Sequence, residues 1–168
     1  MSIAKSKLGY DGTYHVEHRR NGICIHRQPV ENLVVNEGLD YLLGSGMAGV
    51  TQISAWYLGI FETNYTPADD DTAANIAGRC TESTAYDEGA RPLFDYAAVD
   101  TQVLTNAATR AVFTCNATKT MYGLFLVSLA TKQGTTGTLV SVAKFVTARP
   151  VLSGDELLVT YTMTAQDV

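Results

Sequence analysis

The sequence is poor in charged residues and in cysteine. Charged residues make up only 17% of its 168 positions, and the three cysteines, Cys24, Cys80 and Cys115, stand far apart without a CxxC pair. An odd number of widely spaced cysteines argues against a disulfide framework and against a thiolate zinc site. We therefore expect free cysteines, which pack as small hydrophobic groups when they are buried.

A basic cluster is also missing. The formal net charge is −5, and the densest basic group is the pair Arg19 and Arg20. A nucleic-acid-binding surface needs many basic side chains to displace counterions from phosphates, so we expect no nucleic acid partner. The charge is nevertheless uneven, since residues 1–30 hold five basic and two acidic side chains, whereas residues 62–100 hold nine acidic and two basic ones. This polarity either orients a partner or is solvated surface.

Long apolar runs are absent. No run reaches the roughly 18 residues that cross a bilayer, and the N-terminus has no apolar segment of the kind found in signal peptides. The sequence therefore predicts no membrane partner. It is typical of a protein that is made in a reducing cytoplasm, or is assembled there into a particle that leaves.

Motifs for catalysis are missing as well. The chain has no GxSxG, GxGxxG or GxxxxGK[ST] motif, which mark a serine nucleophile, a dinucleotide site and a phosphate-binding loop. Carboxylates do gather at Glu82, Asp87, Glu88 and Asp95, but no spacing there predicts a glycosidase-like pair. We expect no catalytic residues and no cofactor, and hence a protein that is not an enzyme.

The clearest pattern that is present is an alternation of period two in residues 13–28, TYHVEHRRNGICIHRQ. Two alternating runs meet at Asn21-Gly22, a pair that tolerates the positive φ angles of a type I′ hairpin turn. A two-residue loop pairs Arg20 with Ile23, His18 with Ile25 and Val16 with Arg27. It gathers four apolar side chains on one face, which we expect to be buried: Tyr14, Val16, Ile23 and Ile25.

All three histidines fall in this hairpin. The predicted register places His15 and His26 on the opposite face, with Glu17 across from His26 and Cys24 nearby. A metal site of two histidines with a cysteine or a glutamate is geometrically possible there. The alternative, which we favour, is an exposed polar strand face.

One short α-helix is predicted among the strands, at residues 36–44. Asn36 suits its N-cap, Glu37 suits the first turn, and Gly44 ends its apolar stripe.

Strands dominate the rest of the chain. They are predicted at residues 52–61, 109–117, 121–130, 138–148 and 156–165, separated by turn sequences. About eight strands with few helices predict an all-β fold, an antiparallel β-sandwich of jelly-roll or Greek-key type. We divide the chain into an N-terminal arm, residues 1–9, and a single β-sandwich domain, residues 10–168.

The strand predicted at residues 121–130 is apolar on both faces. Such a strand lies either inside a sandwich under a helix or at a contact between subunits. In the second case the interface candidates are its large side chains, together with the paired arginines of the hairpin: Met121, Phe125, Val127, Leu129, Arg19 and Arg20.

The stretch TPADDDTAANIAG, residues 66–78, holds three consecutive aspartates. A calcium loop of the EF-hand type needs an oxygen ligand at its fifth position and glycine at its sixth, but counting from Asp69 places alanines at both. Asp69 and Asp71 remain metal candidates only if distant oxygens join them. The local sequence favours a proline turn followed by a helical turn that Asp71 caps and Ile76 anchors in the core.

Four stretches carry a family resemblance. They are the helix NEGLDYLLG at 36–44, the strand and loop YLGIFETNYTPADDDTA at 57–73, the strand GLFLV at 123–127 and the final LLVTYTMT at 157–164. In these stretches the chain resembles tailed-bacteriophage virion proteins, namely the small β-rich capsid cement (decoration) proteins or tail-associated proteins. The resemblance covers roughly residues 32–164. The chain departs from it where such proteins often carry a GTG turn, because here the strand continues through residues 60–62.

The resemblance implies a non-enzymatic virion protein whose function is contact. It implies a homo-oligomer that binds the major capsid protein on the outer surface of the head and adds non-covalent stability. The arm at residues 1–9 either orders on a neighbouring subunit or is a frayed terminus.

Two other functions stay open. The first is a tail or fibre-associated protein that binds a receptor or carbohydrate, since Trp56, Tyr57 and Tyr65 have rings that stack on sugars, although Trp56 lies in an apolar run typical of a core position. The second is a hydrolase that acts on glycans, and only the acidic region at residues 62–100 favours it.

Overall fold

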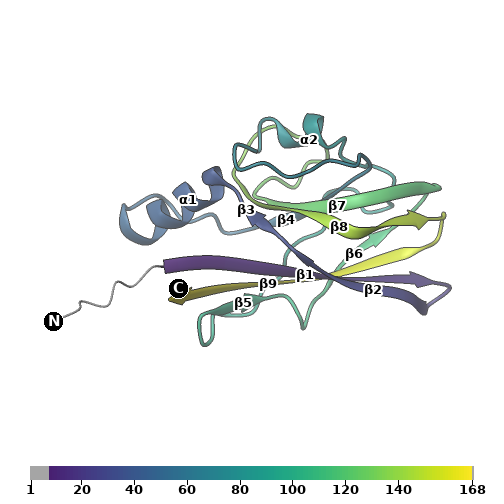
Figure 1. Ribbon diagram of the computed structural model, residues 1–168, viewed down its shortest axis with the longest axis horizontal. Helices are drawn as coiled ribbons and strands as arrows, with labels where there is room; N and C mark the ends of the chain where they lie inside the picture. Colours follow the sequence, from purple (N-terminus) through teal and green to yellow (C-terminus); the bar gives the residue numbers. More distant parts are fainter. Residues whose placement is uncertain (1–7, 168) are drawn as a thin grey trace.

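The protein is a sandwich of two antiparallel β-sheets (Figure 1). The structure, a computed structural model, describes residues 8–167. The two sheets pack face to face; one short helix lies at one end of the sandwich and the other lies over the outer face of the second sheet. This confirms the predicted fold class. Within the described residues, no helix is long and apolar enough to span a membrane.

The first sheet joins the two ends of the chain. Its strands are β1 (Leu8–Arg20), β2 (Ile23–Glu31), β5 (Val103–Thr105), β6 (Ala111–Thr114) and β9 (Glu156–Asp167). The order is β2–β1–β9–β5, and β6 pairs with another part of β9. The first strand therefore lies beside the last along nearly its whole length.

The second sheet has the order β3–β8–β7–β4. Its strands are β3 (Leu33–Val34), β4 (Tyr57–Phe61), β7 (Lys119–Val127) and β8 (Leu139–Val151). Gly137 and Gly154, with φ angles of 98° and 90°, lie in the connections before and after β8, where a positive φ favours glycine. The strands predicted in the second half of the chain are thus all present.

The main core lies between the two sheets. Tyr161 of β9 stacks on Tyr14 of β1 with 4.1 Å between the ring centroids, and the Tyr14 hydroxyl lies 2.7 Å from Oγ of Ser141. The alternation of β9 places four side chains in this core, as predicted: Leu157, Val159, Tyr161 and Met163.

A second apolar cluster covers the outer face of the second sheet. Phe125 and Val127 of β7 point into it, and α2 (Ile76–Arg79) lies over them (Figure 1). Leu124 and Leu126 of the same strand belong to the main core. Both apolar faces of β7 are therefore covered by side chains of the same chain.

The predicted helix is α1 (Asn36–Met47), which is three residues longer than expected because it continues through Gly44. The N-cap predicted at Asn36 is wrong. The cap residue is Val35, without a side-chain cap bond, and the backbone N–H of Asn36 donates to the carbonyl of Asp69 at 2.9 Å.

The first turn of α1 is fixed on the second sheet by Glu37 and Gly38. The Glu37 carboxylate accepts hydrogen bonds from the backbone N–H groups of Ala73 at 2.8 Å and Leu139 at 2.7 Å. Gly38 lies so close to β8 that an added Cβ would come within 2.5 Å of the Val140 carbonyl oxygen. A larger side chain at this position would push the helix off the sheet.

The first hairpin turns at Asn21-Gly22 with φ angles of 50° and 77°, as predicted. Its predicted register is correct only beside the turn. A bulge after His18 shifts the pairing by one residue, so that His18 lies opposite His26 rather than Ile25.

The burial of the hairpin side chains also differs from the prediction. The prediction that Ile23 and Ile25 face the core is wrong, since they are 68% and 46% exposed. Tyr14 and Val16 are buried as predicted, and His18 takes the next inward position with no exposed surface.

The first seven residues of the arm predicted at 1–9 lie outside the described part of the chain. Its last two, Leu8 and Gly9, belong to β1 and pair with Asp167 and Gln166 of β9. These two residues are therefore part of the sandwich.

Candidate functional site

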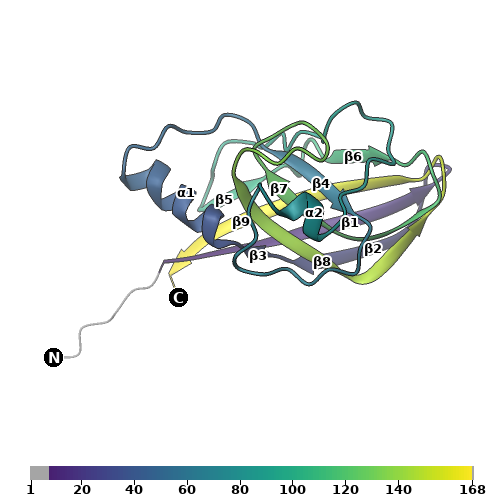
Figure 2. The same ribbon diagram turned by 90° about the horizontal axis from the view of Figure 1, so that it is seen from above.

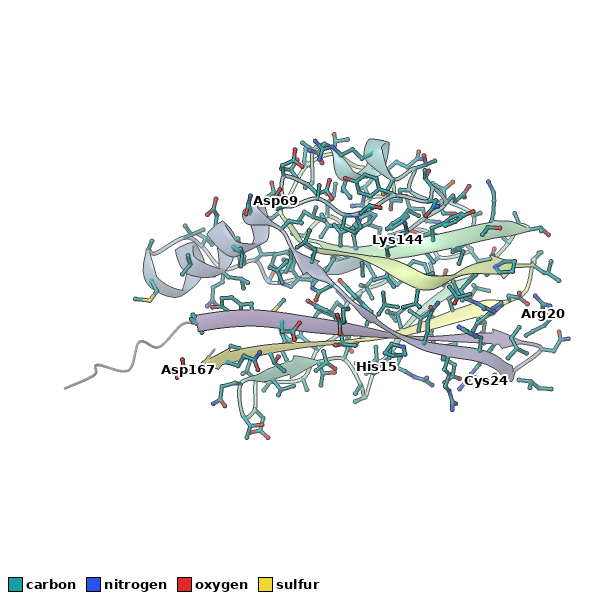
Figure 3. The ribbon with its side chains drawn as sticks, viewed as in Figure 1. His15, Arg20, Cys24, Asp69, Lys144 and Asp167 are labelled. Carbon is teal, nitrogen blue, oxygen red and sulfur yellow. The ribbon has the colours of Figure 1, made fainter. Side chains whose placement is uncertain are left out.

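The turn between β1 and β2 forms one end of the sandwich, and α1 lies at the other (Figures 1 and 2). Arg20 and Cys24 lie together at the turn (Figure 3). Ile23 and Ile25 are exposed there, and Cys24 between them is the exposed one of the three free cysteines. We call residues 19–27 the hairpin tip.

Three arginines gather around Glu17, next to the hairpin tip. The Glu17 carboxylate accepts a hydrogen bond from Nε of Arg27 at 2.9 Å, lies 3.3 Å from Nη1 of Arg110 and pairs with Arg19. The hydrogen bond from Arg19, aided by that from Arg27, holds the pKa of Glu17 below its usual range. The side chains of Arg19 and Arg27 are 31% and 70% exposed. One largely buried carboxylate thus organises three arginines whose charge reaches the surface.

Arg20 points toward the turn between β8 and β9. Its Nε and Nη2 donate to the two carboxylate oxygens of Asp155 at 2.8 and 2.7 Å. The same carboxylate bonds to Nε2 of His18 and to the backbone N–H of Leu152, each at 2.8 Å. These contacts, with that of Arg20 the strongest, hold the pKa of Asp155 well below its usual range although burial opposes them.

His18 completes this buried chain of polar side chains. Its Nδ1 lies 3.1 Å from Nη2 of Arg149, and because a guanidinium only donates, Nδ1 accepts and Nε2 donates to Asp155. Both ring nitrogens are therefore engaged. In this arrangement His18 has no free lone pair for proton transfer, and the cluster fixes the hairpin to the β8–β9 turn.

The acidic stretch is held by an arginine. Nη1 of Arg79 donates to Asp70 at 2.8 Å and to Asp71 at 2.9 Å, so one guanidinium bridges two carboxylates. Asp71 is fully buried, and it also accepts hydrogen bonds from the Tyr65 hydroxyl at 2.6 Å and the Ala68 N–H at 2.9 Å. Burial, together with the contact to Asp71, raises the pKa of Tyr65 to about 12.

The capping role predicted for Asp71 is wrong. The cap residue of α2 is Asn75, whose Oδ1 accepts a hydrogen bond from the backbone N–H of Thr72 at 2.9 Å. The predicted helical turn is present, and Ile76 is fully buried as predicted. Asp69, the other metal candidate of this stretch, is exposed, whereas Asp71 is buried. In the part of the chain that the structure describes, no group of three His, Cys, Asp or Glu side chains could hold a metal ion.

Replacing Asp71 by asparagine should lower the free energy of unfolding by about 1.5–3 kcal/mol, because it weakens buried hydrogen bonds to a charged group. Asp69→Asn, at an exposed neighbour, is the matched control and should change it by less than about 0.5 kcal/mol. Urea unfolding measures both. EDTA should leave the wild-type midpoint unchanged, and a midpoint that fell on chelation would mean that a metal ion holds the loop.

The structure separates the two histidines of the predicted metal site. His15 is exposed on the outer face of the first sheet, opposite Pro29 (Figure 3). His26 lies near Arg149 and His18, and its Nε2 is buried without a hydrogen-bond partner. Burial, aided by these two neighbours, lowers the pKa of His26. The shared face predicted for the two histidines is wrong because the bulge moves His26 opposite His18.

The three predicted interface residues on β7 lie inside the protein. Met121, Phe125 and Val127 are at most 1% exposed, since the main core and the cluster under α2 cover the two faces of the strand. The other predicted interface residues are at least partly accessible: Leu129, Arg19 and Arg20.

The acidic region contains a buried ion pair. Nε and Nη2 of Arg91 donate to the two oxygens of Glu82 at 2.7 Å each, and both side chains are fully buried. Glu88 accepts a hydrogen bond from the backbone N–H of Thr114 at 3.1 Å. Glu82 and Glu88, two of the four carboxylates considered for glycan hydrolysis, therefore bind groups within the fold.

No protein-family model matches the chain, and no curated protein matches it.

Sequence reasoning missed the exposed isoleucines of the hairpin tip. Ile23 and Ile25 continue the alternation of the strand, so they have the pattern of buried positions. Nothing local marks the bulge after His18. The cue that does exist is charge, because Arg19 and Arg27 flank the two isoleucines, and arginine is rarely buried in a core.

Proposed function

We propose that the protein is a structural protein of a tailed-phage virion, a capsid cement protein that binds the outer surface of the head and stabilises it as one of many copies. One observation carries the proposal: large apolar side chains are exposed at both ends of the sandwich. These are Ile23 and Ile25 at the hairpin tip, and Met47 and Val99 at the end that carries α1. Scattered apolar residues are ordinary, but a group at each end supports contact with two neighbours.

The placement of the charged groups supports the same function. Glu82, Asp71 and Asp155 each bind an arginine within the fold, which ties loops and turns to the sheets. A rigid body loses less conformational entropy when it binds. A cement protein benefits from such rigidity, because it stabilises a shell through many repeated non-covalent contacts.

Binding to heads tests the proposal. Heads of the phage that encodes the chain, prepared without it, should bind the purified protein saturably in a sedimentation assay and should then release DNA at a higher temperature. Heads that already carry their full complement should bind no more, which controls for non-specific adhesion. Recovery of the protein on tails, or on neither part, would contradict a role as cement.

A tail or fibre protein that binds a receptor sugar is the second candidate. A cleft of about 160 Å³ on the outer face of the first sheet favours it, because its lining includes His15, Arg27 and Thr160, which offer polar groups to sugar hydroxyls. Trp56 adds nothing to this site, since it is only 8% exposed and packs edge-on against Tyr41. Retention on a glycan array that is lost in His15→Ala would identify this function instead.

A further inference from the structure

An apolar groove opens at the end of the sandwich that carries α1. It has a volume of about 320 Å³ and lies between α1, the paired ends of β1 and β9, and β5 with the turn before it (residues 99–105), which we call the β5 hairpin. A smaller hollow of about 60 Å³ lies beside it and shares three of its lining residues, Leu42, Leu104 and Met163. The groove itself is lined chiefly by Tyr10, Leu42, Val99, Leu104, Met163 and Ala165.

The end of the sandwich that carries this groove has exposed acidic side chains. Asp11, Asp40 and Asp100 are exposed, and each is within two residues of a side chain that lines the groove. Residues 31–78 and 92–109, which supply α1 and the β5 hairpin, contain no lysine or arginine. Among the described residues, the charged side chains near the groove in sequence are therefore all acidic.

The hairpin tip has the complementary properties. It presents two branched aliphatic side chains, Ile23 and Ile25, between arginines whose charge reaches the surface. The bonds of Arg20 to Asp155 hold it in place before any partner binds. Figure 3 shows that Arg20 and Cys24 lie at one end of the molecule and Asp167 at the other, so a tip cannot reach the groove of its own chain.

We infer that the hairpin tip of one copy docks in the apolar groove of a second copy, with Ile23 and Ile25 inserted and the arginines of the tip attracted by the acidic side chains of that end. The contact is head to tail, so a pair of copies keeps one free groove and one free tip, which can continue a ring or an open chain. This goes beyond the proposed function and does not depend on it, because it concerns the purified protein alone. The small contact predicts association in the micromolar to millimolar range, weaker at high salt.

Three variants test this contact by analytical ultracentrifugation. Ile23→Thr with Ile25→Thr removes the apolar tip but keeps β-branched side chains, and Val99→Lys places a cation in the groove at a position that is 67% exposed. Both should remain monomeric at concentrations at which the wild type associates. Val146→Thr, at an exposed position on β8 away from both surfaces, is the control and should associate like the wild type.

Mixing distinguishes a head-to-tail contact from a symmetric one. The tip variant keeps its groove and the Val99→Lys variant keeps its tip, so an equimolar mixture should form capped dimers and nothing larger. Cross-linking adds a positional test in a Cys24→Ser background, under oxidised glutathione. Ile25→Cys and Val99→Cys proteins should each form little disulfide-linked dimer alone and much more when they are mixed.

Three outcomes would overturn the inference. One is a wild type that stays monomeric throughout the concentration range. Another is a tip variant that still associates, and the third is efficient cross-linking of either cysteine protein with itself. Failure of the protein to bind heads would leave the inference intact, since these measurements contain no shell.

Discussion

Glutamine in place of Glu82 is expected to lower the free energy of unfolding by about 3–5 kcal/mol, a large share of the roughly 5–15 kcal/mol that stabilises a typical domain. The Glu82–Arg91 pair has no exposed surface on either side chain. Removing the carboxylate charge leaves the buried guanidinium of Arg91 without a counter-charge. The Cζ atom of this guanidinium lies 5.2 Å from the centre of the Phe125 ring. Urea unfolding gives the loss as a lower midpoint at unchanged slope.

The same pair joins the connection between α2 and β5, which contains Glu82 and Arg91, to the connection between β7 and β8. Nη1 of Arg91 donates to the Leu129 carbonyl at 2.8 Å, and the Gln133 N–H donates to Glu82 at 2.7 Å. Both acceptor and donor lie in the connection between β7 and β8, so the variant should also increase hydrogen exchange there.

Glu62→Gln is the matched control for Glu82→Gln. Its partner Lys119 is 41% exposed, and such surface pairs contribute at most about 1 kcal/mol. Arg91→Met and the double variant complete a cycle in which the double variant should be less destabilised than the sum of the single ones. A wild-type midpoint for Glu82→Gln would show that the pair contributes nothing.

The sheets could be predicted from the sequence wherever a strand alternates and packs on one side. In β9, the buried Tyr161 lies between the half-buried Thr160 and Thr162, so burial follows the alternation in this part of the strand. Alternation is a local property, because successive side chains of a strand point to opposite faces. Strand positions and the fold class therefore follow without knowledge of the partner strands.

The register of the first hairpin could not be predicted in this way. His18 points inward because Asp155, 137 positions along the chain, binds its ring, and β2 accommodates this with one extra residue. A bulge is decided by such distant contacts, and each side chain beyond it changes face. The errors at Ile25 and His26 have this single cause.

Apart from the helical turn at Ile76, the region at residues 62–100 was beyond prediction for a related reason. Its fixed points are polar contacts such as Arg79 with Asp71 and Arg91 with Glu82, not a periodic apolar pattern. Acidic residues that are buried beside an arginine have the same local sequence as acidic residues on a solvated surface. Only the three-dimensional pairing distinguishes the two.

Asparagine in place of Asp155 is expected to lower the free energy of unfolding by about 3 kcal/mol, because it removes a buried charge that accepts several hydrogen bonds. Those bonds join the end of β1, through His18 and Arg20, to the backbone of Leu152 in the β8–β9 turn. Loss of the tie should loosen the hairpin tip as well. Hydrogen exchange in residues 19–27 should therefore increase together with the fall in the urea midpoint.

The pH dependence of stability assigns this effect to Asp155. Its pKa is lower in the folded chain, so its stabilisation is complete above the unfolded pKa of about 3.9 and is lost as the pH falls through the folded value. The pKa of His26 is lowered too, so the unfolded chain gains a proton first and the fold loses stability as the pH falls below about 6.5. Asp155→Asn should flatten the acidic part of the profile and keep the part below neutrality, and His26→Gln should do the reverse. An unchanged acidic part in Asp155→Asn would assign it to Glu17 and Asp70, whose pKa values are also lowered by arginines.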